Sequence, residues 1–314
     1  MKILGKLLAA ALACACTLAP AAPIRTDRVI LLDVAQAGDA LVAVGERGVV
    51  LRSEDRGASW RAVGTPVTRT LSGIALPQGA AGAGVGVAVG HGGTVLRTAD
   101  GGRHWQAVKV DAAGSDALLG ILHTGGAGYI AYGAFGLYLE SADGGASWTR
   151  RQPLGADFDR HISQIVATGD GLLLVGESGT LATSSDRGRS WTPLASPYAG
   201  SYFGALAANS GVLLVYGMRG NVWRSADGGK SWSQVKLGTS LALMNGRALD
   251  DGRLVLVGNA GLVAVSADNG ASFTLHKSAR GKGIAQLGAA TGNTLVVVGE
   301  AGVEQVRIDN PQKD

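Results

Sequence analysis

The side chains most able to carry out chemistry in this chain are aspartates that recur at a regular interval. They stand at Asp55, Asp100, Asp143, Asp186, Asp227 and Asp268. In glycoside hydrolases, two carboxyl groups perform acid–base chemistry when both face one substrate at the required separation. Sequence does not give that separation. A carbohydrate-active protein, either a sialidase-like or other glycoside hydrolase or a glycan binder, is therefore an alternative, and it would depend on carboxylates such as Asp159 and Glu177.

Other reactive side chains lack the spacing of a reaction centre. The spacing of zinc ligands does not occur among the five histidines, at positions 91, 104, 123, 161 and 276. Tyr198 and Tyr202 have no glutamate near them in the sequence, and the Arg-Ile-Pro tripeptide typical of sialidases is absent from it. We therefore expect a protein that is not an enzyme and that holds neither a metal nor a cofactor.

The aspartates belong to an octapeptide that recurs six times. Each copy begins with Ser or Thr, has Asp third and Gly fifth, and ends with an aromatic residue, namely Trp60, Trp105, Trp148, Trp191, Trp232 and Phe273. In such a turn the aspartate accepts backbone N–H groups and the glycine takes a left-handed conformation. We therefore predict a structural role for the six aspartates and five tryptophans, on the face away from any ligand.

A second marker, Gly-x-x-Gly, occurs seven times between short aliphatic runs. Its copies start at Gly45, Gly90, Gly133, Gly176, Gly217, Gly258 and Gly299. Glycine at both ends of a two-residue tip predicts a tight hairpin with positive φ angles. The marker is not a phosphate-binding loop, because we expect a strand rather than a helix after it. Seven hairpins predict seven units.

Each unit reads as four strands, which in the second unit cover residues 71–76, 86–89, 94–98 and 105–110. A four-stranded repeat of 41–45 residues has the length of a β-propeller blade. The seventh unit shows only three strands, and we predict that residues 24–29 supply the fourth and close the ring. The predicted fold is all-β, a seven-bladed β-propeller over residues 22–314.

The composition and the first residues predict an exported chain. Glycine makes up 50 of 314 residues and apolar residues 46%, which disfavours both a disordered chain and a helical bundle. Residues 1–21 read as a signal peptide, with Lys2 and Lys6, an apolar stretch and Ala19-Pro20-Ala21 before the cleavage site. We expect no membrane span in the mature chain, and a location in the periplasm. A lipid anchor on Cys14 is the alternative.

The octapeptide resembles the Asp box of bacterial-neuraminidase repeats, which implies a fold rather than an activity. The whole mature chain resembles the photosystem II stability/assembly factor-like propellers, through LVAVGERGVVLRSEDRGASW (41–60), VAVGHGGTVLRTADGGRHW (87–105) and VYGMRGNVWRSADGGKSW (215–232). Photosynthetic members of that family bind membrane-protein intermediates through an Arg-lined face. The resemblance implies a binding protein, and does not by itself imply a photosystem as the partner.

In a propeller, the loops from second to third strand and from fourth to first strand share one face. We predict a partner-binding face there, formed by Arg47, Arg69, His91, Arg160, His161, Tyr202, Phe203, Arg219, Arg280 and Lys282. Arginine and aromatic residues are enriched in interface hot spots, and arginine binds carboxylates in two places at once. We predict a monomer that captures an acidic or extended segment of an envelope or inner-membrane protein. A net charge of +4 with no basic run argues against nucleic acid.

Overall fold

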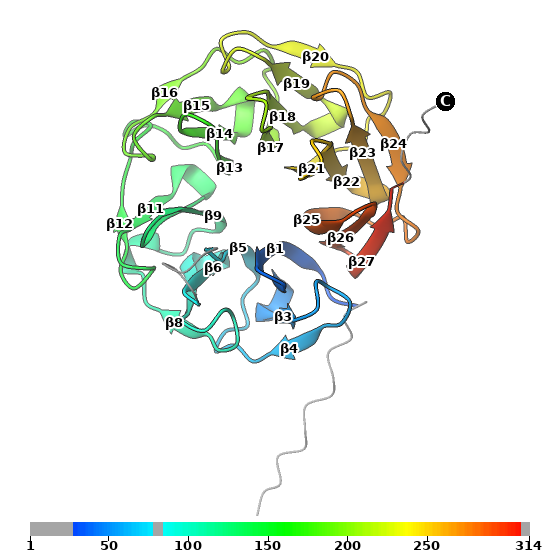
Figure 1. The fold of residues 1–314 in the computed structure, drawn as a ribbon. Helices are drawn as coiled ribbons and strands as arrows, with labels where there is room; N and C mark the ends of the chain where they lie inside the picture. Colours follow the sequence, from blue (N-terminus) through cyan, green and yellow to red (C-terminus); the bar gives the residue numbers. More distant parts are fainter. Residues whose placement is uncertain (1–27, 78–83, 309–314) are drawn as a thin grey trace, which may run out of the picture.

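The computed structural model describes residues 28–77 and 84–308, which form seven antiparallel sheets arranged in a ring (Figure 1). The predicted all-β, seven-bladed propeller is confirmed. Blades one and two contain β1 (Leu31–Ala37), β2 (Ala40–Gly45), β3 (Val50–Ser53), β4 (Arg61–Val63), β5 (Leu71–Ala75), β6 (Gly86–Gly90), β7 (Thr94–Thr98) and β8 (Gln106–Val108). Blades three and four contain β9 (Leu118–Gly125), β10 (Gly128–Gly133), β11 (Tyr138–Ser141), β12 (Thr149–Arg150), β13 (Ile162–Ala167), β14 (Leu172–Gly176), β15 (Leu181–Ser184) and β16 (Thr192–Pro193).

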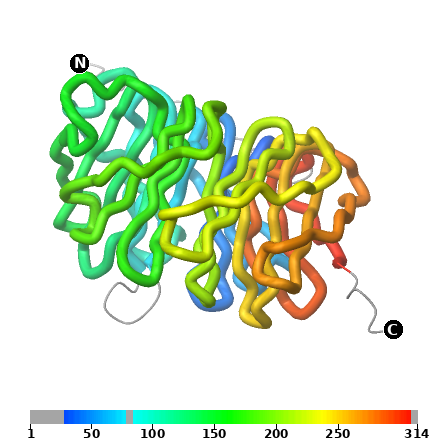
Figure 2. Tube along the Cα trace, turned by 90° about the horizontal axis from the view of Figure 1, so that it is seen from above, coloured from blue at the N-terminus to red at the C-terminus, as the bar shows by residue number. Residues whose placement is uncertain are grey.

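The remaining blades complete the ring in chain order. Blades five and six contain β17 (Tyr202–Ala207), β18 (Leu213–Gly217), β19 (Val222–Ser225), β20 (Ser233–Val235), β21 (Leu243–Ala248), β22 (Leu254–Gly258), β23 (Leu262–Ser266) and β24 (Thr274–Lys277). Blade seven contains β25 (Ile284–Thr291), β26 (Thr294–Gly299) and β27 (Gly302–Arg307). Viewed edge-on, the ring carries its turns on two opposite faces (Figure 2).

The second strand of each blade is apolar on both sides because it packs against both neighbouring blades. In β14, for example, Leu172 and Leu174 belong to the core shared with blade three, whereas Leu173 and Val175 belong to the core shared with blade five. Strand geometry explains the division, since successive side chains point to opposite faces. The protein therefore has a hydrophobic cluster at each joint between blades instead of one central core.

The Gly-x-x-Gly segments form hairpin turns, but the prediction that both glycines supply a positive φ is wrong for the first one. Gly45 is extended, with a φ of −169°, and a Cβ atom there would lie 2.1 Å from the Ile30 carbonyl oxygen. The left-handed residues are Arg47 and Gly48, with φ of 56° and 72°. The first glycine is needed because the turn lies directly against the chain that enters the blade, where Glu46 N–H donates to the Ile30 carbonyl at 3.0 Å.

Six of the seven turns contain a one-turn 3-10 helix instead of the predicted two-residue tip. These are η1 (Glu46–Gly48), η3 (His91–Gly93), η5 (Ala134–Gly136), η6 (Glu177–Gly179), η7 (Met218–Gly220) and η8 (Asn259–Gly261). A further 3-10 helix, η4 (Asp111–Ala113), lies between blades two and three. The two-residue tip occurs in blade seven, where Gly299 pairs with Gly302. All seven turns face the connections between blades, so together they form one surface, the hairpin face.

The predicted closing strand is not formed by the described residues. Residues 28–29 lie in a bend rather than a strand, residues 24–27 lie outside the described range, and β25, β26 and β27 make a three-stranded sheet. The joint between blades seven and one is instead held by side chains, with Val29, Val34 and Val296 in one shared core. The predicted signal peptide and Cys14 also lie outside the described residues.

Candidate functional site

Each of the six octapeptides folds as a turn that is bonded to itself. In the third copy, Ser141 Oγ donates to Asp143 Oδ1 at 2.8 Å and accepts Gly145 N–H at 2.9 Å. Ser147 donates its N–H to Asp143 Oδ1 at 2.9 Å and its hydroxyl to Oδ2 at 2.6 Å. Trp148 Nε1 donates to the Gly145 carbonyl at 3.1 Å. Four other copies repeat the serine bonds to the aspartate. In the second copy His104 replaces the serine, with its N–H on Asp100 Oδ1 at 2.9 Å and its imidazole Nδ1 2.6 Å from Oδ2.

These bonds determine the ionisation of the aspartates. The bonds from Ser147 lower the pKa of Asp143 to about 2. The pKa values of Asp55, Asp186 and Asp227 are lowered to about 2 by the equivalent serine bonds. A carboxyl group with so low a pKa is ionised at neutral pH and cannot donate a proton as a general acid. The aspartates therefore lack the protonation state that acid catalysis at neutral pH requires.

The octapeptide turns lie on the side of the ring opposite the hairpin face. Arg56 N–H donates to the Asp39 carbonyl at 3.0 Å, which places the first octapeptide beside the turn between β1 and β2. Because strands alternate in direction, that turn is at the other end of the blade from the Gly-x-x-Gly turn. We call this side the Asp-box face.

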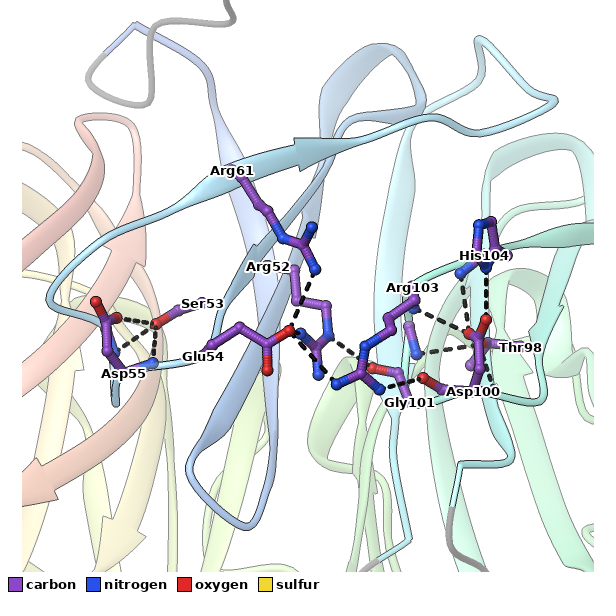
Figure 3. A network of polar contacts seen from close by, with 12 residues as sticks. Arg52, Ser53, Glu54, Asp55, Arg61, Thr98, Asp100, Gly101, Arg103 and His104 are labelled. Atoms are coloured by element: carbon purple, nitrogen blue, oxygen red, sulfur yellow. Dashed lines mark hydrogen bonds and ion pairs between the residues drawn. The ribbon is translucent and has the colours of Figure 1, made fainter.

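Arginines from one blade bond the octapeptide of the next, a feature that the sequence analysis missed. Arg52 Nε donates to the Gly101 carbonyl at 3.0 Å, as shown in Figure 3, and Arg97 Nε donates to the Gly144 carbonyl at 2.8 Å. Arg224 does the same to Asn269, at 2.8 Å. We call these three residues the latch arginines. Each stands directly before the first residue of an octapeptide, and this repeated position in the sequence could have identified them.

The predicted partner-binding residues gather on the hairpin face, with one correction. Seven of them are exposed, namely Arg47, Arg69, His91, Arg160, Arg219, Arg280 and Lys282, whereas His161 and Phe203 are half-buried. Tyr202 is fully buried, and its hydroxyl bonds Ser196 Oγ at 2.9 Å. The reason is that Tyr202 is the first residue of an innermost strand. In every other blade this position holds a buried apolar residue. Tyr202 therefore supports the fold rather than contacting a partner.

The guanidinium groups of the five arginines of this face lie at the tips of hairpin turns, two from the turns themselves and three from the connections between blades. Arg47 and Arg219 are themselves the third residue of Gly-x-x-Gly, with φ of 56° and 55°. Arg160 Nη1 donates to the carbonyl of Ser178, the third residue of its neighbouring turn, at 3.3 Å. Arg280 Nη1 donates to the equivalent Ala301 carbonyl at 2.6 Å.

Arg69 covers the corresponding residue of the second blade. A Cβ atom on Gly92 would lie 2.6 Å from Arg69 Nη1. Guanidinium groups thus stand at the turns of blades one, two, four, five and seven. In the third blade the same position is occupied by Phe135, which is 59% exposed and has a φ of 52°.

Apolar side chains are concentrated on the same face. Of the six large apolar side chains that are exposed in the described part of the chain, five lie there: Ile30, Phe135, Met218, Leu241 and Met244. Phe135 packs edge-on against His161, with 4.9 Å between ring centroids. The hairpin face therefore combines exposed cations with exposed apolar side chains.

Three glutamates of the hairpin face are engaged by the backbone. Each is the second residue of Gly-x-x-Gly, and its carboxylate accepts an N–H of the chain that enters the blade. Ile30 N–H donates to Glu46 at 3.3 Å, His161 N–H to Glu177 at 3.1 Å and Gly283 N–H to Glu300 at 3.2 Å. These carboxylates hold the turns in place, a role that needs no substrate.

Two further features bear on the kind of site present. Within residues 28–77 and 84–308, no group of three or more His, Cys, Asp or Glu side chains is placed to hold a metal ion. Nor does that part of the chain contain a helix long and apolar enough to cross a membrane.

Comparison with known proteins confirms the predicted resemblance. The model of the family described as "Photosynthesis system II assembly factor YCF48" matches residues 119–313, more than half of the chain. No curated protein sequence matches it. Among solved structures, "YCF48 bound to D1 peptide" is similar with a TM-score of 0.72 and 16% identity, covering 90% of this chain and 95% of that one.

Two other structures show how widely this fold is used. YCF48 from Cyanidioschyzon merolae has a TM-score of 0.69 and 14% identity, covering 89% of this chain and 95% of that one. A GH74 xyloglucanase from Xanthomonas campestris has a TM-score of 0.67 and 16% identity, covering 90% of this chain but 52% of that one. At such identities the structural likeness shows the fold alone. It is the match of the family model over blades three to seven, on a seven-bladed ring, that shows the chain to be a member of the YCF48 photosynthesis system II assembly factor family.

Proposed function

We propose that this protein is a non-catalytic scaffold that holds an acidic or extended segment of an envelope or inner-membrane protein on its hairpin face during assembly of a complex. The observation that carries the proposal is the set of five guanidinium groups at hairpin tips, on the same face as five exposed apolar side chains. Guanidinium groups bind carboxylates in a two-point geometry, and exposed apolar side chains supply desolvated contacts. A segment that carries both acidic and apolar side chains fits this surface.

Membership of the YCF48 family supports an assembly role, because the family is described by that role. The similar structure of YCF48 bound to D1 peptide supports a peptide as the kind of ligand. For the present chain we describe the ligand by its chemistry. It is an extended segment whose carboxylates are spaced so that they reach the arginines of several blades.

A non-catalytic role is supported by the state of the carboxylates. The Asp-box aspartates are bonded within their turns and have low pKa values. The glutamates of the hairpin face accept backbone N–H groups. A glycoside hydrolase needs a carboxyl group that is protonated at working pH beside a second carboxylate, and these residues do not offer that pair.

We also propose that the protein works in the periplasm, on the basis of the signal-like residues 1–21. Cell fractionation and the mass of the mature N-terminus test this part. A chain that starts at residue 22 in the periplasmic fraction supports it. A chain starting at Cys14 with an added lipid mass would instead assign a membrane anchor, and an intact N-terminus in the cytoplasm would overturn export.

The binding proposal is tested by reversing three of the tip arginines, Arg47→Glu, Arg219→Glu and Arg280→Glu. Tagged wild-type protein is crosslinked in the envelope, purified and analysed by mass spectrometry. We expect one membrane protein to dominate the wild-type sample and to fall at least tenfold in the variant, because several charge-assisted contacts are lost together. The melting curve of the variant checks that the ring is folded.

A matched control reverses three exposed cations of the Asp-box face, Arg103→Glu, Arg189→Glu and Lys230→Glu, which are all sixth residues of octapeptides and change the net charge equally. Capture should survive in this control. Equal loss in both variants would mean that net charge matters rather than the hairpin face. Turnover or binding of sialosides or glucans by the wild type, without any protein partner, would favour the carbohydrate-active alternative.

A further inference from the structure

A pocket that the proposed function does not use lies on the Asp-box face, at the joint between blades three and four. Its volume is about 620 Å³, within the range of small-molecule sites. The wall from blade three includes Glu140, Asp143 and Arg151, and the wall from blade four includes Arg187 and Arg189. Three arginines and two carboxylates therefore line one cavity.

This joint differs from the three that carry a latch arginine, because the residue at that position in blade three is not an arginine. Blades four and six also have another residue there, Thr183 and Val265. The position of the latch arginines is occupied in blade three by Glu140, a carboxylate that cannot donate to a carbonyl group. Glu140 instead accepts a bond from Arg151 Nε at 3.2 Å. In the next octapeptide, the residue whose carbonyl would receive the latch is Arg187. At the buried end of the pocket the two walls are joined by Tyr138, which donates to the Gly188 carbonyl at 2.8 Å and accepts Trp191 Nε1 at 3.4 Å.

A second pocket of similar size, about 610 Å³, lies at the joint between blades one and two and serves as an internal comparison. There each of three arginines is paired with a carboxylate of the protein. Glu54 pairs with the latch residue Arg52, with Arg61 at 3.2 Å and with Arg103 at 3.5 Å (Figure 3). These cations lower the pKa of Glu54, chiefly through the hydrogen bond from Arg52.

In the pocket between blades three and four, by contrast, one of the three arginines is paired in this way. Arg151 is paired with Glu140, and Asp143 is occupied by the bonds of its own turn. In the described part of the chain, the side chains of Arg187 and Arg189 pair with no carboxylate. Arg187 also holds a left-handed backbone, with a φ of 62°, at a position where three other octapeptides have glycine and one has asparagine. Two uncompensated guanidinium groups thus share one cavity.

We propose that this pocket binds a small organic polyanion, with Arg187 and Arg189 on one wall and Arg151 on the other. A guanidinium group binds both carboxylate and phosphate oxygens in a two-point geometry. The ligand is therefore a molecule that fits the cavity and carries two or more anionic oxygen groups. Ser147 and Thr149 line the same space. A bound anion joins blade three to blade four where the latch arginine is missing.

The test uses the full chain and two probes, citrate and inorganic phosphate, by calorimetry and thermal melting at fixed ionic strength. The variant Arg187→Asn with Arg189→Ala copies residues found at the same positions of other octapeptides, so the turn keeps its conformation. We expect citrate to bind and to raise the melting temperature, and the double variant to weaken binding tenfold or more. The matched control is Arg103→Ala, in the charge-compensated pocket, which should bind citrate as the wild type does.

The outcomes separate the sources of the anion. Binding of citrate alone assigns a polycarboxylate, and binding of both probes assigns anionic oxygen groups in general. Equal binding by the wild type and the double variant would overturn the proposal, as would no binding of either probe. Binding of an oligoglutamate peptide in place of both probes would also overturn it and make this an acidic-peptide site. Each result is independent of partner capture on the hairpin face.

Discussion

Asp143 accepts four hydrogen bonds from its own turn, from Ser141, Ala146 and both the backbone and the hydroxyl of Ser147. The charge-assisted bonds hold its pKa at about 2, well below the ordinary value of 3.8. A carboxyl group whose pKa is lower in the folded state stabilises the fold at pH values above its unfolded pKa. That stabilisation is lost as the pH falls toward 2, because the proton enters the unfolded chain first.

Replacing Asp143 with Ala should lower the melting temperature at pH 7, because the N–H groups of Ala146 and Ser147 lose their acceptor. The difference in melting temperature between wild type and variant should narrow between pH 4 and pH 2, because the wild-type carboxylate becomes protonated in that range. Circular dichroism melts across this range measure both effects, with exposed Asp157→Ala as the control. Partner capture should not change, and an unaltered melting curve would contradict the structural role.

At the scale of the elements, the joints between blades are where the ring gains or loses stability. Each joint has its own hydrophobic cluster, and the latch arginines add a bond to the neighbouring octapeptide at three of them. The Gly144 carbonyl that receives Arg97 Nε at 2.8 Å belongs to a left-handed turn.

Substitution of Arg97 by Ala should destabilise the protein by about 1–3 kcal/mol, the usual cost of removing a charged donor from a partly buried acceptor. Glu140→Arg should instead raise the free energy of unfolding, because it supplies the missing latch to blade four. Chemical denaturation of both variants measures the two changes, with Arg150→Ala as a control for losing an exposed arginine. A Glu140→Arg protein that is less stable than the wild type would show that the latch cannot form at that joint.

Sequence predicted the elements well because their signals are local. Seven Gly-x-x-Gly turns and six octapeptides were enough for the number of blades, and the loops that a propeller gathers on one side gave the residues of the hairpin face. Contacts between blades were harder to foresee. The first glycine of each turn is required by a carbonyl group of the incoming chain, as at Gly45 and Ile30. Tyr202 was expected on the surface, since the buried first position of each innermost strand becomes clear only once the blades are superimposed.

At the scale of the whole molecule, the ring has to close between its first and last blades, and Asp33 is central to that closure. Its carboxylate accepts Gln286 Nε2 of blade seven at 2.8 Å and Ile74 N–H of blade two at 2.8 Å. One side chain of blade one thus connects both neighbours. The side chain keeps some accessible surface, but protein surrounds the carboxylate, and burial raises its pKa above 3.8.

Because the pKa of Asp33 is higher in the folded state, the folded protein binds this proton more tightly than the unfolded chain. The contribution of Asp33 to stability is therefore greatest below the unfolded pKa and decreases as the pH rises through the folded value. Asp33→Ala should destabilise the ring by about 1–3 kcal/mol, since Ile74 N–H loses its partner, and the loss should be larger at pH 4 than at pH 7. Denaturation at the two pH values measures this, and the reverse order would contradict the buried state of the carboxylate.

The third residue of the hairpin turns has a consequence for how this protein can change over evolutionary time. In six blades it takes the same left-handed backbone whether it is Arg47, Gly92, Phe135, Ser178, Arg219 or Ala260. A point mutation there alters charge or shape at the surface while the strands and joints keep their contacts. New specificities can therefore arise one blade at a time in a lineage whose ring stays intact, and an engineer can recombine the same positions into a library of binders.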